Sequence, residues 1–310
     1  MAKSQLPLAL SADALERHLQ DLKLGFIAEH YGELAQQAAH KQCSHVEYLG
    51  QLVEGEAHRL RDRATQNRIR QARFPVIKTR DQFRWDWPTQ INRALVQQHF
   101  TLSFLKDHMN LIYLGNVGLG KTHLAVALGY EACLKGHTVL FASAIDVINT
   151  LVVAKTAGRL KQEIKKYTKP ALLIVDELGY LPIDKSGADL LFQVISGRYE
   201  QGSTLITSNR AFKDWPKIFN NDSTLTSALL DRLLHHAETV VIEGKSYRMK
   251  GKLDVERSPH RVSPERPRTH LAALSPACLP FGFSNQRFPP DFAYRSHVMG
   301  EDSRNSPLRV

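Results

Sequence analysis

The 310-residue sequence has few cysteines and no long apolar run. Without about 20 consecutive apolar residues, no segment is expected to cross a membrane as a helix. The first residues, Met1–Pro7, also lack the apolar core of a signal peptide. The three cysteines, Cys43, Cys133 and Cys278, are far apart and show no metal-ligand spacing. We interpret them as reduced thiols and expect a cytoplasmic protein with no membrane partner.

Acidic residues are nearly absent from residues 59–80. There, eight Arg and Lys side chains stand against Asp62 alone, in a chain whose net charge is +10. At about 100° per residue, four of the arginines share one side of a helix: Arg59, Arg63, Arg70 and Arg73. The guanidinium group forks onto phosphate, so we expect this arginine stripe to bind the DNA backbone. The alternative is a solvated helix face without a partner.

What the sequence does contain is a phosphate-binding loop. Residues 115–122 fit G-x-x-x-x-G-K-[ST] at every fixed position; they are Gly115, Asn116, Val117, Gly118, Leu119, Gly120, Lys121 and Thr122. Glycines let backbone N–H groups approach a triphosphate, Lys121 can place its ammonium between the outer phosphates, and Thr122 can bind Mg²⁺. An apolar run precedes the loop and a helical stretch follows it, which is the context that the motif requires. We therefore expect a nucleoside triphosphate, taken as ATP, and Mg²⁺.

Apolar runs and helical stretches alternate around this loop. The apolar runs are continuous, as is typical of strands buried on both faces, and span residues 111–114, 138–142, 171–175, 204–207 and 239–242. The helical stretches span residues 123–135, 146–167, 186–201 and 225–236. This alternation predicts an α/β domain built on a doubly wound parallel sheet.

The N-terminal segment has helical periodicity. Apolar residues recur at spacings of three and four from Leu15 to Leu34, which predicts an amphipathic helix. Residues 44–47 fit a capping box that begins a second helix. The apolar residues that follow on one face of it are Val46, Leu49 and Val53. We expect both apolar faces to pack into the core of a small helical domain.

Four parts are expected in all. They are a helical N-terminal domain, a linker, the nucleotide-binding domain and a disordered tail, at residues 1–75, 76–92, 93–252 and 253–310. In the linker, Trp85 and Trp87 are expected to pack against the next domain rather than to stack on bases. Eight of the fourteen prolines lie after Lys252, where no periodic apolar face can be drawn, and this composition indicates disorder.

Acidic and polar residues end two of the predicted strands. Asp176 and Glu177 follow the run 171–175, and Asn209 follows 204–207. Beside a phosphate loop, Asp176 can hold Mg²⁺, Glu177 can polarise a water for attack on the γ-phosphate, and Asn209 can orient that water. The alternatives are acids that only end a strand and an asparagine that only makes a turn. A carboxylate that activates water favours hydrolysis over transfer to an acceptor.

An arginine, Arg232, interrupts the apolar helical segment Leu229–Leu234. One interpretation is a surface arginine paired locally with Asp231. The other is an arginine finger that completes the site of a neighbouring subunit, since one such arginine can be worth ~10³ or more in rate.

These motifs together resemble an AAA+ ATPase of the DnaC/IstB group. The segments that carry the resemblance are Gly115–Thr122, Leu172–Glu177, Thr207–Asn209, Leu230–Leu233 and Ser246–Met249. Within the group, three features resemble the IstB-like transposition helpers more than the helicase loaders: Asp176–Pro182, Trp215 with Ile218 and Phe219, and Arg68–Pro75. The resemblance covers residues from about 10 to 252. Asn116 and Val117 stand where the family often has prolines, and the tail has no counterpart.

The resemblance implies roles and partners. It implies Lys121 and Thr122 at the phosphates and Mg²⁺, with Asp176 on Mg²⁺ and Glu177 as the base. It also implies Asn209 as first sensor, Arg232 as a finger supplied in trans, and Arg248 as second sensor at the nucleotide. The implied partners are duplex DNA bound without sequence preference, further copies of the chain assembled with ATP, and a transposase encoded by the same insertion sequence.

Four functions remain open from the sequence. They are an ATP-driven, DNA-bound helper of a transposase, a replicative helicase loader, a phosphotransferase acting on a small acceptor, and a nucleotide-binding scaffold that barely hydrolyses. An adjacent transposase reading frame would separate the first two. Release of phosphate that DNA stimulates, without an added acceptor, would separate the first from the last two.

Overall fold

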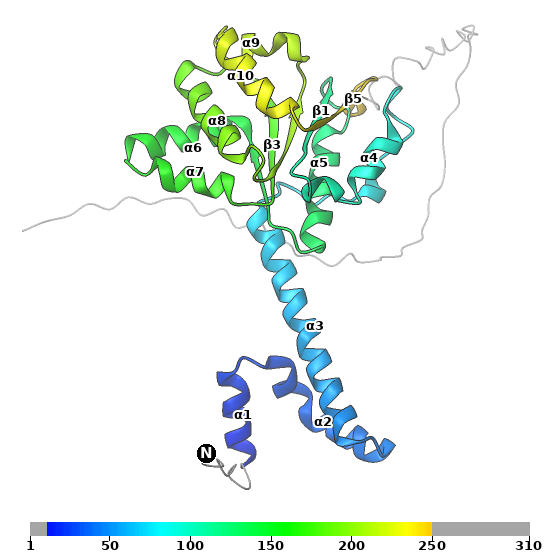
Figure 1. Cartoon of the computed structure of the whole chain (residues 1–310). Coiled ribbons are helices and arrows are strands. Elements are labelled where there is room, and N and C mark those ends of the chain that lie inside the picture. The colour runs from blue at the N-terminus through cyan, green and yellow to red at the C-terminus, as the bar shows by residue number, and fades with distance from the viewer. Residues whose placement is uncertain (1–10, 250–310) are drawn as a thin grey trace, which may run out of the picture. The chain divides into compact units, whose positions relative to one another are not determined.

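A parallel five-stranded sheet forms the centre of the computed structural model, which describes residues 11–249 (Figure 1). The strands are β1 (Asn110–Gly115), β2 (Val139–Ser143), β3 (Leu172–Leu178), β4 (Ser203–Ser208) and β5 (Ala237–Ile242). They pair in the order β2-β3-β4-β1-β5, and every pair is parallel. The predicted strands and their parallel pairing are confirmed. The tail expected after Lys252 lies outside the described residues.

This strand order gathers the predicted site residues at one edge of the sheet. β4 lies between β1, which ends at the phosphate loop, and β3, which carries the acidic pair just before its last residue. Because the strands are parallel, the carboxyl ends of all three meet on the same side. Residues that follow β4 are therefore placed between the loop and the acids.

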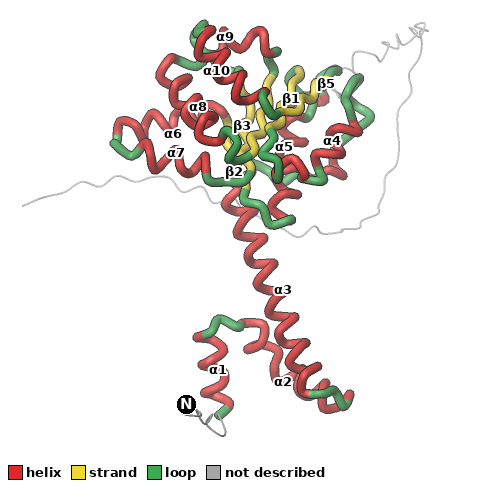
Figure 2. The backbone as a smooth tube through the Cα atoms, in the orientation of Figure 1, coloured by secondary structure: helices red, strands yellow, loops and turns green. Residues whose placement is uncertain are grey.

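Helices cover both faces of the sheet, and alternate strand residues face each layer (Figures 1 and 2). Leu172 and Ile174 pack in the cluster that contains α5, whereas Leu173 and Val175 pack in the cluster that contains α6 and α8. All four side chains are fully buried. The continuous apolar runs are thus explained by strands buried on both faces. The helices of this part are α4 (Arg93–His99), α5 (Lys121–Leu134), α6 (Ala144–Thr156), α7 (Leu160–Thr168), α8 (Lys185–Arg198), α9 (Trp215–Ile218) and α10 (Ser223–Leu234).

One predicted helix is broken in two. The stretch 146–167 was expected to be continuous, but α6 ends at Thr156 and α7 begins at Leu160. Gly158 between them has a φ of 68°, a left-handed conformation that ends helices and that glycine adopts readily. Short helical turns outside the long helices are η1 (Arg80–Gln82), η2 (Ser103–Leu105), η3 (Phe212–Asp214) and η4 (Tyr247–Met249).

The N-terminal region consists of α1 (Ala12–Asp21), α2 (Gly25–Lys41) and α3 (His45–Ala72). The first predicted helix is interrupted, because Lys23 has a φ of 59° and separates α1 from α2. The capping box is confirmed: Ser44 Oγ accepts from the Glu47 backbone N–H at 3.2 Å, and Glu47 Oε2 accepts from the Ser44 N–H at 2.7 Å. These two bonds satisfy backbone donors that a helix start leaves free.

The expected burial of one face of α3 is wrong. Val46, Leu49 and Val53 are exposed, whereas Leu52 and Glu56 are the residues that face α2 and are buried. The Glu56 carboxylate accepts a hydrogen bond from the Ile27 backbone N–H at 3.1 Å, next to the start of α2. A single neighbouring helix pair covers only one side of a long helix, so the other apolar side stays uncovered in one chain.

The segment 76–92 packs on the nucleotide-binding part, as expected for its tryptophans. Phe83 is buried, and Trp85 packs against the same cluster of core residues. An isolated antiparallel bridge joins Gln90 to Glu243 just after β5. No helix within residues 11–249 is long and apolar enough to cross a membrane.

Candidate nucleotide-binding site

The phosphate loop connects β1 to α5, as the sequence predicted. Gly118 and Gly120 have φ values of 80° and 85°, and Gly120 is the N-cap of α5. A Cβ atom at Gly118 would collide with the Ser246 side chain, and one at Gly120 with the ring of Phe83. Glycine is therefore required here both by the left-handed backbone and by the close approach of neighbouring segments.

Lys121 lies at the first turn of α5 and folds back over the loop. Its Nζ donates hydrogen bonds to the carbonyl oxygens of Gly115, at 2.7 Å, and Asn116, at 2.9 Å. Burial lowers the pKa of the ammonium, and the carboxylates of Asp176 and Glu177 oppose this effect. A lysine that is already partly desolvated among backbone carbonyls gains by meeting phosphate oxygens, which carry full negative charge.

Thr122, Asp176 and Thr207 form a hydrogen-bonded chain across three elements. The Thr122 hydroxyl donates to both carboxylate oxygens of Asp176, at 3.0 Å each. From β4, the Thr207 hydroxyl donates to Asp176 Oδ1. Asp176 is only 5% exposed, so these bonds compensate the burial of its carboxylate. The chain fixes Asp176 against the first turn of α5, beside the phosphate loop.

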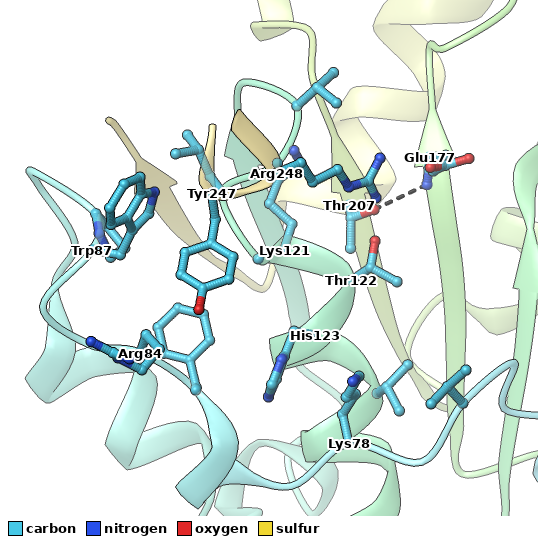
Figure 3. Close-up of a pocket in the computed structure, with 18 of the residues that line it drawn as sticks. Lys78, Arg84, Trp87, Lys121, Thr122, His123, Glu177, Thr207, Tyr247 and Arg248 are labelled. Carbon is cyan, nitrogen blue, oxygen red and sulfur yellow. Dashed lines mark hydrogen bonds between the residues drawn. The ribbon is translucent and has the colours of Figure 1, made fainter. Parts of the chain in front are cut away.

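Glu177 is held in an unusual backbone conformation. Its φ is 60°, and the pairing of β3 with β4 is irregular between Val175 and Leu178. The backbone N–H of Glu177 donates to Thr207 Oγ1 at 3.0 Å, the dashed bond in Figure 3. Left-handed conformations are costly for residues other than glycine and concentrate at functional sites. The irregularity lets Asp176 stay buried while Glu177 is exposed at the pocket.

Asn209 lines the same pocket, directly after β4. Its Oδ1 atom is buried and has no hydrogen-bond partner among the described residues. An amide oxygen in this position is costly unless a ligand or water supplies a donor. The position fits the expected role of Asn209 in orienting a water at the transferred phosphate.

The pocket has a volume of about 810 Å³ and extends beyond the phosphate loop. Figure 3 shows Trp87, Arg84 and Tyr247 on one side of it, and Lys121, Thr122 and Glu177 on the other. On the side with Trp87 and Tyr247, the two rings form an aromatic wall. They meet edge to face, with 5.3 Å between their centroids. A pocket of this volume, with aromatic rings next to a phosphate site, is suited to bind a nucleoside.

Two hydrogen bonds hold this wall in place, and the first of them joins it to the phosphate loop. The Tyr247 N–H donates to the Gly118 carbonyl at 2.9 Å, and the Trp87 Nε1–H donates to the Lys245 carbonyl at 2.8 Å. Arg248, the neighbour of Tyr247, lines the pocket, and its guanidinium extends toward Thr207 (Figure 3). The role of Arg248 as second sensor remains a prediction. The sequence did not identify Arg84 and Tyr247 as pocket residues, and their only signal was proximity to the aromatic segment and to Arg248.

Arg232 is not brought into this pocket. Its Nη1 donates to the Ala228 carbonyl at 3.0 Å, and its guanidinium lies over the Phe192 ring, 4.8 Å from the centroid. No ion pair joins it to Asp231 among the described residues. The local pairing considered from the sequence is therefore not observed, and the role in trans remains a prediction.

The arginines expected to bind DNA lie along α3 and at its end, and their environments differ. Arg59 makes a two-pronged ion pair with Glu29, at 2.7 and 2.9 Å. Arg63 is exposed, Arg70 donates to Asn67 Oδ1 at 3.1 Å, and Arg73 ends the helix with a φ of 59°. Arg68, on the other side, donates to the Cys133 carbonyl of α5 at 3.0 Å. Because the Arg59 guanidinium is paired with Glu29, the guanidinium groups of Arg63, Arg70 and Arg73 are better placed to pair with phosphate.

The donor set around Asp176 fits Mg²⁺. Hard divalent cations prefer carboxylate and hydroxyl oxygens, and Asp176 and Thr122 present both types next to the phosphate loop. Within residues 11–249, the other group of side chains close enough to hold a metal is Glu200 with His235 and His236, which is exposed. That group lies outside the nucleotide pocket.

The parallel strand order, the phosphate loop after β1 and the acidic pair near the end of β3 define a P-loop nucleotide-binding domain. The family described as IstB-like ATP binding protein matches residues 17–255. This chain belongs to that family.

Named relatives support this assignment. A protein of Pseudomonas aeruginosa, named for ATP binding and insertion sequence IS21, is 40% identical over 77% of this chain and 89% of its own length. One of Geobacillus stearothermophilus, named for ATP binding and insertion sequence IS5376, is 36% identical over 77% of this chain and 95% of its own. The crystal structure of the DnaC helicase loader is 22% identical, covers 48% of this chain and 87% of that chain, and superposes with a TM-score of 0.41. That superposition is too partial to carry an argument about function.

Proposed function

We propose that this protein hydrolyses ATP on duplex DNA and thereby assists a transposase encoded by the same insertion sequence. The observation that carries the proposal is the chain of hydrogen bonds joining Thr122, Asp176, Thr207 and Glu177 beside the phosphate loop. The names of the relatives, which mention ATP binding and insertion sequences, support the setting.

Binding of the triphosphate is assigned to the loop and to Lys121. The loop glycines let backbone N–H groups approach the phosphates, and the N-terminus of α5 adds a partial positive charge. Lys121 exchanges its two carbonyl partners for oxygens of the outer phosphates. The aromatic wall of Trp87 and Tyr247 receives the nucleoside, with Arg248 between it and the phosphates.

Thr122 and Asp176 hold Mg²⁺ in this proposal. When bound, the ion neutralises charge that develops on the phosphates during hydrolysis. The Thr207 hydroxyl keeps the Asp176 carboxylate in one orientation, so the site is preorganised.

Glu177 is assigned as the general base. Its exposed carboxylate faces the pocket, while its backbone is fixed through Thr207. The carboxylate takes a proton from a water that attacks the γ-phosphate, and Asn209 orients that water with its unpartnered amide oxygen. A base positioned for water, with no acceptor pocket assigned, favours hydrolysis over transfer to a small molecule.

The remaining parts of the proposal concern assembly. Arg63, Arg70 and Arg73 bind phosphates of duplex DNA without reading its sequence. Copies of the chain assemble with ATP, and Arg232 of one subunit completes the site of the next. We place the protein in the helper class rather than among helicase loaders because its family and its named relatives belong to insertion sequences.

The test is phosphate release with and without duplex DNA, in wild type, Lys121→Ala and Glu177→Gln. Wild type should release phosphate without an acceptor, and faster with DNA. Lys121→Ala should lose ATP binding, whereas Glu177→Gln should bind ATP and turn over about 10²–10⁴-fold more slowly, the usual contribution of a general base. Equal turnover in Glu177→Gln and wild type would refute the assignment of the base.

The transposase part needs a separate experiment. The stalled Glu177→Gln protein, assembled on DNA with ATP, should capture the transposase encoded beside its own gene. Capture of a replicative helicase instead of that transposase would favour the loader function.

A further inference from the structure

Two turns at the amino ends of β4 and β5 bring together three side chains that can ligate a metal. Glu200 follows α8 and precedes β4, whereas His235 and His236 join α10 to β5. One ligand atom from each side chain lies within 4.8 Å of the others, and all three residues are exposed. Because the phosphate loop follows the carboxyl end of β1, this His–Glu cluster lies at the opposite end of the sheet from the nucleotide pocket.

Contacts with the core hold both turns in place. The buried Arg198 closes the turn that carries Glu200, since its guanidinium donates to the Ser203 carbonyl at 2.6 Å. At the other turn, the backbone N–H of Asn110 donates to the His236 carbonyl at 2.7 Å. β1, which begins at Asn110, pairs with both β4 and β5. One central strand therefore sets the spacing of the two turns that carry the cluster.

Tyr199 orients one of the two imidazoles. Its hydroxyl lies 3.0 Å from Nδ1 of His235. When Nδ1 carries the hydrogen and donates it to this hydroxyl, the lone pair of the ring is on Nε2 and is available to a metal. A hydrogen bond from the second ring nitrogen is the usual support of a metal-binding histidine. The ring of His236 packs edge to face on that of His235, with 4.2 Å between centroids, which keeps the two imidazoles adjacent.

The donor set of the His–Glu cluster is typical of zinc. Two imidazole nitrogens and one carboxylate oxygen, with water as fourth ligand, are the donors of open tetrahedral zinc sites. Mg²⁺ prefers six oxygens instead. At a Zn–ligand distance of ~2.1 Å, the ligand atoms of a tetrahedron are about 3.4 Å apart. Exposed side chains that already lie within 4.8 Å of one another can close that difference by small rotations.

A metal can bind this cluster without breaking an existing ion pair. Among residues 11–249, none of the ion pairs includes Glu200, His235 or His236. The contrast is with His99, which is buried and lies 2.7 Å from the Glu238 carboxylate. That histidine is committed to the fold, whereas the two histidines of the cluster keep their ring nitrogens at the surface.

We propose that Glu200, His235 and His236 bind a divalent transition metal with the ligand preference of Zn²⁺. Tyr199 is the positioning residue that orients His235. The metal joins the turn after α8 to the turn after α10 and so stabilises the end of the sheet opposite the nucleotide. The site is separate from the proposed ATPase function, because it uses no residue of the nucleotide pocket and needs neither ATP nor DNA.

The first experiment measures zinc bound per full-length chain by equilibrium dialysis at micromolar Zn²⁺. Millimolar Mg²⁺ is present to fill the site beside the phosphate loop. Wild type should bind one zinc more than His236→Gln or Glu200→Gln, whose affinity at this site should fall about 100-fold or more. Tyr199→Phe keeps all three ligands and should weaken binding about tenfold, as is usual for a residue that supports a ligand. His58→Gln is the matched control, because His58 forms an exposed pair with Glu54 on α3, and it should not change zinc binding.

Cobalt absorption and thermal melting test the geometry of the site. Tetrahedral Co²⁺ absorbs visible light far more strongly than octahedral Co²⁺, so the wild type should give a tetrahedral spectrum that added Zn²⁺ removes. A metal that binds only the folded chain also raises its melting temperature. That rise should be present in wild type and in His58→Gln and absent in His236→Gln. Each variant is first checked, without metal, for unchanged helix content and melting temperature.

Three results would overturn the proposal. Equal zinc content in wild type, His236→Gln and Glu200→Gln would place any bound zinc elsewhere in the chain. A dissociation constant in the millimolar range would mean that the three side chains only share a surface. An octahedral cobalt spectrum would contradict the proposed ligand set. None of these results would affect the ATPase proposal, and Lys121→Ala should bind zinc as the wild type does.

Discussion

Thr207 of β4 donates its hydroxyl hydrogen to Oδ1 of Asp176 on the neighbouring strand β3. The Thr207 hydroxyl oxygen in turn accepts a hydrogen bond from the backbone N–H of Glu177. One side chain thus controls both the carboxylate assigned to Mg²⁺ and the backbone of the proposed base. Thr207 carries no charge, and the sequence assigned it no role of its own, although it begins the segment Thr207–Asn209.

Replacing Thr207 with valine should therefore impair turnover more than binding. Valine has nearly the same shape but removes a donor and an acceptor. A hydrogen bond to a charged group contributes ~1.5–3 kcal/mol, so the turnover number should fall by about tenfold or more. Steady-state phosphate release at several Mg²⁺ concentrations measures this, and the Mg²⁺ requirement should rise as well.

Thr207→Ser is the control, because it keeps the hydroxyl and should retain most of the activity. If valine and serine reduced turnover equally, the hydroxyl would not be the group that matters. The methyl group and its packing in β4 would then explain the loss.

Arg232→Ala should bind ATP normally and lack turnover. The guanidinium lies outside its own nucleotide pocket, so its proposed contact is with the neighbouring subunit's phosphate. Mixing this variant with Lys121→Ala should restore some hydrolysis, because an intact site can form from one residue of each chain. If confirmed mixed assemblies recovered nothing at any ratio, a finger in trans would be excluded.

DNA binding by the arginine stripe should show in its salt dependence. Log K falls with log salt by about 0.9 per phosphate neutralised on duplex DNA. Replacing Arg63, Arg70 and Arg73 together by Gln should reduce that slope by roughly 2 to 3, to the same extent on two unrelated sequences. The binding is measured over a salt series after confirming that the variant is folded.

Arg59→Gln provides the comparison within the stripe. Because the Arg59 guanidinium is paired with Glu29 in the structure, its removal should change the slope less than one phosphate contact would. An unchanged slope in the triple variant would mean a solvated stripe, and the DNA contacts would have to lie on the AAA+ domain.

His99 predicts an acid-sensitive step in stability. Its Nε2 lies 2.7 Å from Glu238 Oε2 and its Nδ1 lies 3.0 Å from the Tyr113 hydroxyl. A carboxylate only accepts, so Nε2 carries the hydrogen and Tyr113 donates to Nδ1. Burial lowers the pKa of His99 below the usual 6.5, although the Glu238 carboxylate opposes this.

The sign of the effect follows from that shift. Below about pH 6.5 the unfolded chain binds a proton on His99 more readily than the folded chain does. The free energy of unfolding therefore decreases as the pH is lowered. Thermal melting of wild type should drop between pH 7.5 and pH 5.5, and His99→Gln should show a smaller drop. An identical drop in both proteins would assign the acid sensitivity to other groups.

The local parts of this molecule follow from the sequence by itself. The phosphate loop, the capping box of α3 and the five strands all depend on residues close together in the chain. The order of apolar runs and helices then implied parallel pairing, because parallel strands need crossover connections. Asp176, Glu177 and Asn209 were located because each lies within two residues of the end of a predicted strand.

Tertiary structure decided which of these residues share a site and which surfaces are covered. Thr207 acquires its partners only when β4 pairs with β3, and Trp87 and Tyr247 meet from segments far apart in the chain. Val46, Leu49 and Val53 have the periodicity of a buried face, yet α2 packs on the adjacent side of α3, against Leu52 and Glu56. Periodicity tells which residues form a face, but burial depends on what packs against that face.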